Sequence, residues 1–175
     1  MRGRRRRSRR APVCGWRDRD DAAWMREALR VARNSSRRGE VPIGAVVVQR
    51  GRIVGRGANR PIGGRDPTAH AEVVAIRRAA KRLGNYRLGG TTLCVTLEPC
   101  LMCLGAMVQA RIGRLVYGAA DSKIGAVALL KSRRLRGLNH RFPACGGVLA
   151  GESAELLRDF FRRRRAVSRC RRALP

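Results

Sequence analysis

A short apolar segment that leads into a pair of cysteines constrains the fold of this chain more than any other feature. Residues 92–97 read Thr-Leu-Cys-Val-Thr-Leu, which is typical of a buried strand. Glu-Pro-Cys-Leu-Met-Cys follows at 98–103, and we expect a helix from Cys100 to about Arg111 with Pro99 at its first position. Cysteines three residues apart at the start of a helix share one face, and the helix dipole favours their thiolate forms.

The cysteine pair by itself leaves three interpretations open. It suits a soft divalent metal, with zinc the first choice, but C-x-x-C also occurs in redox motifs, and both thiols could be buried structural residues. The other cysteines, at 14, 94, 145 and 170, form no compact disulfide framework. Since nothing signals secretion, paired cysteines favour metal binding or catalysis over a bridge.

The rest of the pattern predicts helices that alternate with strands after an opening hairpin. We expect Asp20 or Asp21 to cap the first helix, and Asp66 or Thr68 to cap the second. In chain order the expected elements are a helix to about Arg38, a hairpin of strands 43–48 and 53–54, a turn-rich loop 59–64, a helix ending at Gly84, the strand 92–97, the cysteine helix, a strand 114–118, a loop over 119–147, a short strand 148–149, and a helix from Gly151 or Ser153 to 162–165.

This order predicts an α/β fold with three layers, α-β-α, in which helices cover both faces of a mixed, about five-stranded central sheet. Helices that join parallel strands start at the same edge of the sheet, where ligands bind in such folds. His70 lies near the start of the second helix, and Cys100 lies at the start of the next one. We therefore expect the histidine and the cysteines to converge.

The chain is strongly basic, with 40 lysines and arginines against 12 acids and a formal charge of +28. Seven arginines and no acid occur in residues 1–13, and the same is true of residues 162–175. We expect a basic disordered arm at 1–16, one domain at 17–165 and a basic tail at 166–175. The charge favours a polyanionic partner, nucleic acid first, although a merely soluble basic surface or GC-rich codon usage would give a similar composition.

The N-terminal arm has two explanations, a nucleic-acid-binding segment or a start codon assigned too far upstream. No apolar run approaches the ~20 residues that a membrane span needs, and the arm lacks the apolar region of a secretory signal. We expect a cytoplasmic protein that does not enter a membrane.

His70, Cys100 and Cys103 together supply three metal ligands. A structural zinc ion normally has four protein ligands, whereas a catalytic one keeps a position for water. Glu72 is two residues from His70, so it can stand beside the metal, take a proton from the bound water and return it to a substrate. A helix-cap histidine and a first-turn acid are the structural alternatives, but they do not explain why both occur with the cysteine pair.

His70-x-Glu72 with Pro99-Cys100-x-x-Cys103 is the signature of zinc-dependent nucleobase deaminases. From about Trp24 to Arg165 the chain resembles the bacterial tRNA-specific adenosine deaminases. The matching segments are 41–46, 59–63, 66–72, 85–88, 95–103, 111–114, 118–125, 139–141 and 159–162. The later segments distinguish this family from free-base deaminases that share the zinc motif.

The resemblance implies a cytidine-deaminase-like fold, a homodimer, and hydrolysis of adenosine to inosine at the wobble position of a tRNA anticodon. The arginine tRNA is the first candidate for this substrate. It implies one zinc ion per subunit, bound by His70, Cys100 and Cys103, with Glu72 as the proton shuttle. Single-stranded loops suit this chemistry, because the base need not leave a duplex. Its implied substrate contacts are Asn59 and the backbone near Ala71 for the base, and Asp121, Lys123, Asn139 and Phe161 for the anticodon loop.

Two other functions stay open from the sequence. A zinc deaminase of a free nucleobase or nucleoside would use the same chemistry, but it would not need the basic charge or the Asp-Phe-Phe-Arg segment at 159–162. A non-enzymatic RNA-binding module with structural zinc would need a fourth protein ligand and would leave Glu72 without a role.

Overall fold

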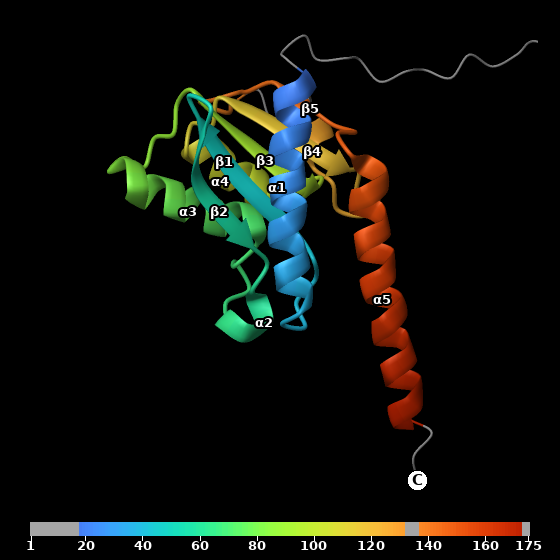
Figure 1. Ribbon diagram of the computed structural model, residues 1–175. Helices are drawn as coiled ribbons and strands as arrows, with labels where there is room; N and C mark the ends of the chain where they lie inside the picture. Colours follow the sequence, from blue (N-terminus) through green and yellow to red (C-terminus); the bar gives the residue numbers. More distant parts are fainter. Residues whose placement is uncertain (1–17, 132–136, 173–175) are drawn as a thin grey trace, which may run out of the picture.

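The computed structural model describes residues 18–131 and 137–172, which form a mixed sheet between two layers of helices (Figure 1). The expected three-layer α-β-α fold is confirmed. The elements in chain order are α1 (Asp18–Ser36), β1 (Gly44–Gln49), β2 (Arg52–Ala58), α2 (Pro61–Gly64), α3 (Ala71–Leu83), β3 (Thr91–Leu97), α4 (Leu101–Gln109), β4 (Arg114–Ala119), the 3-10 helix η1 (Val127–Lys131), β5 (Ala144–Cys145) and α5 (Ala150–Arg172).

The five strands lie in the order β2-β1-β3-β4-β5. β1 is antiparallel to both of its neighbours, with Ala45 opposite Gly57 of β2 and Val95 of β3. β2 and β3 therefore run in the same direction, and β4 is parallel to β3. As a result, α3 follows β2 and α4 follows β3 at the same edge of the sheet.

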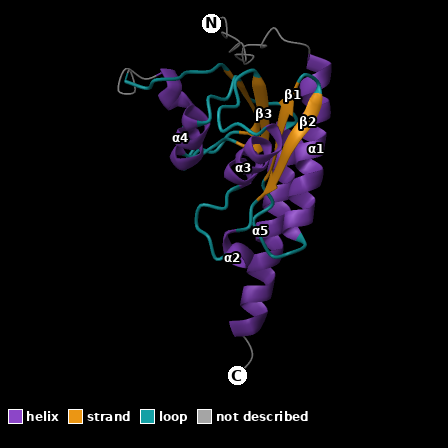
Figure 2. Cartoon of the chain, turned by 90° about the vertical axis from the view of Figure 1, so that its left-hand side faces the viewer, coloured by secondary structure: helices purple, strands orange, loops and turns teal. Residues whose placement is uncertain are grey.

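α3 and α4 cover one face of the sheet, and α1 and α5 cover the other (Figure 2). The larger core lies under α3 and α4 and includes Leu93 and Met107, which are fully buried. The smaller core lies under α1 and includes Met25 and Val116. Burial of these apolar faces against the sheet holds the layers together.

The second helix begins later than expected. The carboxylate of Asp66 accepts hydrogen bonds from the backbone N–H (2.8 Å) and the hydroxyl (2.6 Å) of Thr68, and this closes a separate turn. α3 starts only at Ala71, with His70 as its N-cap, so the prediction of a cap at Asp66 or Thr68 was wrong. The expected stop at Gly84 is confirmed, since this residue has a left-handed backbone.

The cysteine helix also begins later, because Cys100 is the N-cap of α4 and Pro99 precedes it. At the N-terminus, Asp21 lies inside α1, and its carboxylate accepts two hydrogen bonds from Arg114 of β4, at 2.6 and 2.7 Å. This ion pair joins two distant segments of the chain. Since α1 begins at Asp18, the predicted cap at Asp20 or Asp21 was wrong.

Two segments predicted as loops contain short helices in the structure. The turn-rich loop at 59–64 contains the short helix α2, and the loop over 119–147 contains η1. The edge strand β5 occupies 144–145, so the strand predicted at 148–149 was wrong. α5 continues to Arg172 through most of the segment expected to be a tail, and the expected arm at 1–16 lies outside the described residues.

Among the described residues, no helix is both long enough and apolar enough to cross a bilayer.

Glycines in β1 and β2 let two helices lie very close to the sheet. A Cβ atom at Gly44 would overlap the carbonyl oxygen of Ala28 in α1. A Cβ atom at Gly57 would overlap the carbonyl oxygen of Ala71, the first residue of α3. The absence of a Cβ atom at position 57 therefore lets the start of α3 lie this close to the sheet.

We predict that Gly57→Ala lowers the free energy of unfolding by about 2–3 kcal/mol, because the added methyl meets backbone atoms that cannot turn aside. Urea unfolding measures the effect. Gly151→Ala is the matched control, since it also replaces a glycine by alanine, in α5, and the added Cβ atom meets nothing within 4 Å. Equal stability of Gly57→Ala and the wild type would contradict the close approach.

A shared carboxylate joins α1 to the edge strand. Glu27 accepts hydrogen bonds from Arg30, one turn along α1, and from Arg56 of β2, all at 2.8–2.9 Å. These two guanidinium groups, Arg30 first, lower the pKa of Glu27 to about 2. The ionised form of Glu27 is therefore favoured in the folded chain.

We predict that Glu27→Gln changes the acid sensitivity of the fold. Because the pKa of Glu27 is lower in the folded chain, its contribution is present above about pH 4.5 and is lost as the pH falls toward 2. At pH 7 the variant should be about 1 kcal/mol less stable, since both arginines are exposed and solvent screens the pair. Urea unfolding from pH 7 to pH 2 should show this difference shrinking, and a difference independent of pH would refute it.

Candidate active site

The N-termini of α3 and α4 bring one histidine and two cysteines together. Nδ1 of His70 lies 3.7 Å from Sγ of Cys100 and 3.5 Å from Sγ of Cys103. All three possible ligand atoms lie within 4.8 Å of one another. His70 and Cys100 are half-buried N-caps, and Cys103 is fully buried in the first turn of α4. The expected convergence is confirmed.

The cluster fits a tetrahedral divalent metal. With metal–nitrogen bonds of about 2.0 Å and metal–sulfur bonds of about 2.3 Å, tetrahedral ligands lie roughly 3.5–3.8 Å apart. The distances from Nδ1 of His70 fall in this range. Among the described residues, the cluster has these three possible ligands, which leave a fourth position open. The other histidine is engaged elsewhere, since Nε2 of His140 contacts the carbonyl of Ile112 at 2.7 Å.

The electrostatics of the cluster also fit a cation. Burial, and then the neighbouring Glu72 carboxylate, raises the pKa of the Cys103 thiol, so a thiolate there needs a nearby positive charge. Burial lowers the pKa of His70, which favours the neutral imidazole that binds metals. A divalent cation would compensate both thiolates at once.

Glu72 lies beside the cluster in the first turn of α3 and is only 4% exposed. Burial raises the pKa of its carboxyl, and its own backbone N–H and the Cys103 thiol act in the opposite direction. This carboxyl is thus buried next to a candidate ligand, a position that suits a proton-transfer group.

Asn59 follows β2, and both its side chain and its backbone are held by hydrogen bonds. Its side-chain Oδ1 accepts the backbone N–H of Ala71 at 2.8 Å, and its backbone carbonyl accepts the hydroxyl of Ser35 at 2.9 Å. The amide nitrogen is the part of the side chain left to donate. The N–H of Ala71, which we expected near a base, is donated to Asn59 here. No sequence signal pointed to Ser35, because its role depends on α1 lying beside this loop.

The loop after β4 is tied to the cysteine segment through Glu98. One carboxylate oxygen accepts the N–H of Asp121 at 3.1 Å and the other accepts the N–H of Val127 at 3.2 Å. The side chain of Asp121 in turn accepts the N–H of Lys123 at 2.9 Å. This ties the loop with Asp121 and Lys123 to Glu98, two residues before Cys100. Glu98 was not among the predicted site residues, although an acid between a buried strand and Pro-Cys was a usable signal.

Two of the predicted substrate residues lie elsewhere. The carbonyl of Asn139 accepts a hydrogen bond at 2.9 Å from Arg111, which follows the C-terminal end of α4. Phe161 is 43% exposed on α5 and packs edge-on against Phe160. Within residues 18–131 and 137–172, no contact joins either residue to the cluster, so their roles stay predictions.

Comparisons with known proteins agree with this architecture. A sequence model of the MafB19-like deaminases matches residues 19–165. A tRNA-specific adenosine deaminase from Haemophilus influenzae is 45% identical over 159 residues, which cover 88% of this chain and 90% of that protein. One from Agrobacterium fabrum is 48% identical over 143 residues, covering 81% and 94%.

Solved structures give the same picture. One, from studies of A-to-I editing by tRNA:A34 deaminases at the wobble position, is 45% identical and superposes with a TM-score of 0.73 over 77% of this chain and 99% of that chain. A guanine deaminase from Nitrosomonas europaea is 27% identical, with a TM-score of 0.68 over 79% and 83%.

The three-layer fold and the His-Cys-Cys cluster with an adjacent glutamate define a deaminase of the cytidine-deaminase-like class. The chain belongs to the MafB19-like deaminase family and, within it, to the group of the tRNA-specific adenosine deaminases.

We predict that Cys103→Ala abolishes binding of the metal, because two ligands do not replace a chelating set of three. Elemental analysis of the purified protein should find less than a tenth of the metal that the wild type carries. Cys145→Ala is the matched control, since Cys145 lies in β5, outside the cluster, and it should keep full metal content. An undiminished metal content in Cys103→Ala would remove Cys103 as a ligand.

Proposed function

We propose that this protein hydrolyses adenosine to inosine at the wobble position, position 34, of a tRNA anticodon, with the arginine tRNA as the first candidate. The observation that carries the proposal is the buried Glu72 beside the His70–Cys100–Cys103 cluster, in a chain 45–48% identical to tRNA-specific adenosine deaminases. We also propose that the enzyme is cytoplasmic and forms a homodimer. Analytical ultracentrifugation would measure the dimer.

His70, Cys100 and Cys103 would hold one zinc ion per subunit, since one nitrogen and two sulfur donors at this spacing are typical of catalytic zinc. Zinc supplies a water nucleophile at neutral pH by lowering the pKa of the water toward ~7. The chain itself holds this position at the edge of the sheet, where the first turns of α3 and α4 meet.

Glu72 moves the protons in the proposed reaction. It accepts one proton from the attacking water and delivers it to the ring nitrogen next to the reacting carbon. It then transfers the second proton to the exocyclic amino group, which leaves as ammonia while a carbonyl forms. The sum is adenosine plus water giving inosine plus ammonia, with no change of oxidation state. Its position two residues after His70 keeps it beside the cluster through both transfers.

Asn59 orients the base. Because Oδ1 accepts the N–H of Ala71, the amide nitrogen remains as a donor and would fit an unprotonated ring nitrogen of a purine. The bond from Ser35 and the bond from Ala71 together fix this orientation before the substrate enters. Asp121 and Lys123, on the loop anchored by Glu98, are proposed contacts to the anticodon loop.

A free nucleobase is the second candidate substrate, because the chain also resembles a guanine deaminase from Bacillus subtilis at 42% identity over 56% of its length, with a TM-score of 0.54. The two functions separate in one assay. The purified enzyme should form inosine at position 34 of tRNA, read by sequencing, and should release little ammonia from guanine or free adenosine. If the enzyme released ammonia from a free base and left adenosine 34 of the tRNA unchanged, the free nucleobase would be the better candidate substrate.

We predict that Glu72→Gln slows inosine formation on an anticodon stem-loop by about 10²–10⁴-fold, because an amide cannot accept the water's proton. Elemental analysis should find zinc content unchanged, since Glu72 is not a ligand. Glu155→Gln, a change at an exposed acid of α5, is the control and should keep wild-type turnover. Wild-type turnover in Glu72→Gln would sink the proposed mechanism.

A further inference from the structure

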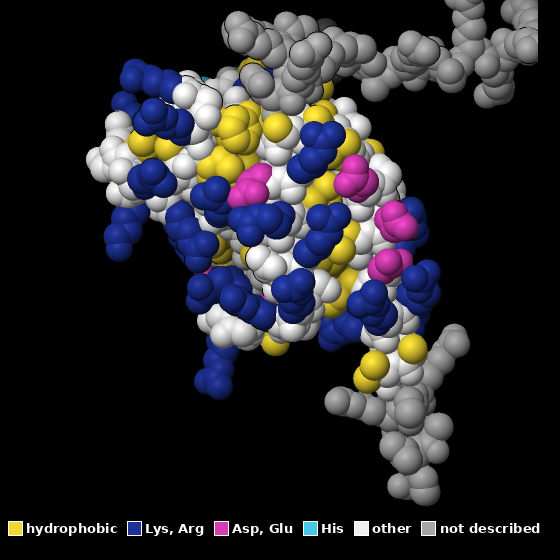
Figure 3. All heavy atoms as spheres, in the orientation of Figure 1, with side chains coloured by type: hydrophobic (Ala, Val, Ile, Leu, Met, Phe, Trp, Pro, Cys, Tyr) yellow, Lys and Arg dark blue, Asp and Glu magenta, His cyan; other side chains and the backbone are white. Residues whose placement is uncertain are grey.

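Six arginines surround a groove along the edge of the sheet where β2 is the outermost strand. We call it the β2-edge groove, and its arginines are Arg30, Arg38, Arg56, Arg60, Arg77 and Arg78. It consists of two adjoining cavities, of about 280 and 510 Å³, which share Arg60, Val74 and Arg78. Lysine and arginine side chains gather over this face of the molecule (Figure 3).

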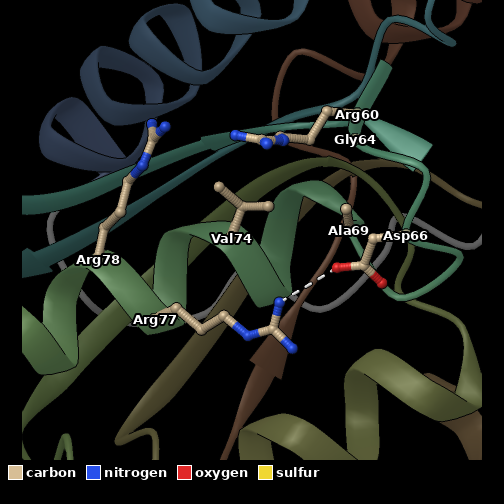
Figure 4. Close-up of a pocket in the computed structure, with 7 residues that line it drawn as sticks. All are labelled: Arg60, Gly64, Asp66, Ala69, Val74, Arg77 and Arg78. Atoms are coloured by element: carbon tan, nitrogen blue, oxygen red, sulfur yellow. Dashed lines mark hydrogen bonds and ion pairs between the residues drawn. The ribbon is translucent and has the colours of Figure 1, made fainter. Parts of the chain in front are cut away.

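The smaller cavity lies between α3 and the chain around α2. Arg60 and Arg78 extend toward each other above Val74, and Arg77 reaches Asp66 on the other side (Figure 4). The Arg77–Asp66 pair is long, at 3.5 Å, and both side chains are exposed. It therefore neutralises this end of the groove only weakly.

The larger cavity lies between α1 and β2. Arg30 and Arg38 border it from the α1 side, and Arg56 borders it from β2. Arg30 and Arg56 share the single carboxylate of Glu27. Arg78 donates to the carbonyl of Arg56 at 3.0 Å, which is a neutral acceptor.

Positive charge in the groove exceeds negative charge. Glu40 also borders it, but its carboxylate is buried and accepts the backbone N–H groups of α2, that of Gly63 at 2.7 Å. Among the described residues, neither Arg38 nor Arg60 makes an ion pair with an acid. A concave surface with this excess attracts polyanions, because its field is concentrated between the two walls.

The groove meets the active site at one end. Arg60 directly follows Asn59, and its backbone N–H donates to the carbonyl of Ala69 at 3.0 Å. Ala69 precedes the candidate ligand His70, so the two segments that position the site also form the wall of the smaller cavity. A polynucleotide whose reacting base lies beside Glu72 can therefore continue into the groove.

We infer that the β2-edge groove binds the phosphodiester backbone of the tRNA substrate outside the anticodon loop, along one strand of the anticodon stem. One guanidinium group can donate two parallel hydrogen bonds to the oxygens of a phosphate, and it is always charged. A row of arginines therefore suits a repeating series of phosphates. This inference rests on the proposed function, since it assigns a second contact region to the same RNA.

Protection of the sheet edge does not explain the whole cluster. Charged side chains on an outermost strand prevent pairing with other chains. That role accounts for Arg56, which is on β2. The other five arginines come from α1, the turn after it, the loop after β2 and α3, so they have no part in blocking strand pairing.

The test uses the double variant Arg38→Gln with Arg78→Gln, and its control is Arg26→Gln with Arg82→Gln. Both variants remove two exposed arginines near α1 and α3, but only the first pair lines the groove. The probes are an anticodon stem-loop and an oligonucleotide of the loop nucleotides alone. For the stem-loop, the groove variant should raise KM and Kd about tenfold at 150 mM salt and keep kcat at saturation.

The salt dependence separates a backbone contact from a folding defect. Loss of two phosphate contacts should make the slope of log Kd against log salt less steep by about 1.5–2, whereas the control should keep the wild-type slope. The loop-only oligonucleotide should bind both variants equally. Thermal unfolding of both variants checks that they fold.

Three outcomes would overturn the inference. These are equal effects of the two double variants on stem-loop binding, an equal loss for the loop-only oligonucleotide, and a loss confined to binding of polyglutamate, which would make the occupant an acidic polypeptide. Failure of the proposed function gives a different result, because the wild-type enzyme would then form no inosine in tRNA. The comparison of stem-loop affinities would still decide whether the groove binds RNA.

Discussion

The direction of three strands determines where this protein places its chemistry. β1 is antiparallel to both β2 and β3, and β4 is parallel to β3, so β2, β3 and β4 all point the same way. The helices that follow β2 and β3 consequently start at one edge. His70 and Cys100 are the caps of these helices, so the candidate metal ligands meet without any long loop to carry them.

Close packing sharpens that arrangement. Gly57 lets the first residue of α3 approach the sheet, and the position of α3 sets both His70 and Glu72. Buried polar groups then fix the surrounding loops, since Asn59 is held by Ser35 and Ala71, and Glu98 anchors the loop after β4. Such preorganised groups cost no rearrangement when a substrate binds.

The excess of arginine has a structural as well as a functional side. Some arginines are matched one to one inside the fold, such as Arg114 with Asp21. Others line the β2-edge groove, where acids are too few to neutralise them. The formal charge of the whole chain does not distinguish these groups, because it ignores where each side chain lies.

The sequence by itself determined the class of fold, the order of most elements and the candidate ligand set, because hydrophobic periodicity, turn residues and the His-x-Glu and Pro-Cys-x-x-Cys spacings are local properties of the chain. It could not determine the helix starts at Ala71 and Leu101, the strand at 144–145, or the roles of Ser35 and Glu98. Those depend on hydrogen bonds and packing between segments far apart in the chain, which only the tertiary structure decides. The β2-edge groove arises in the same way, since its arginines come from separate segments and meet only in the folded protein.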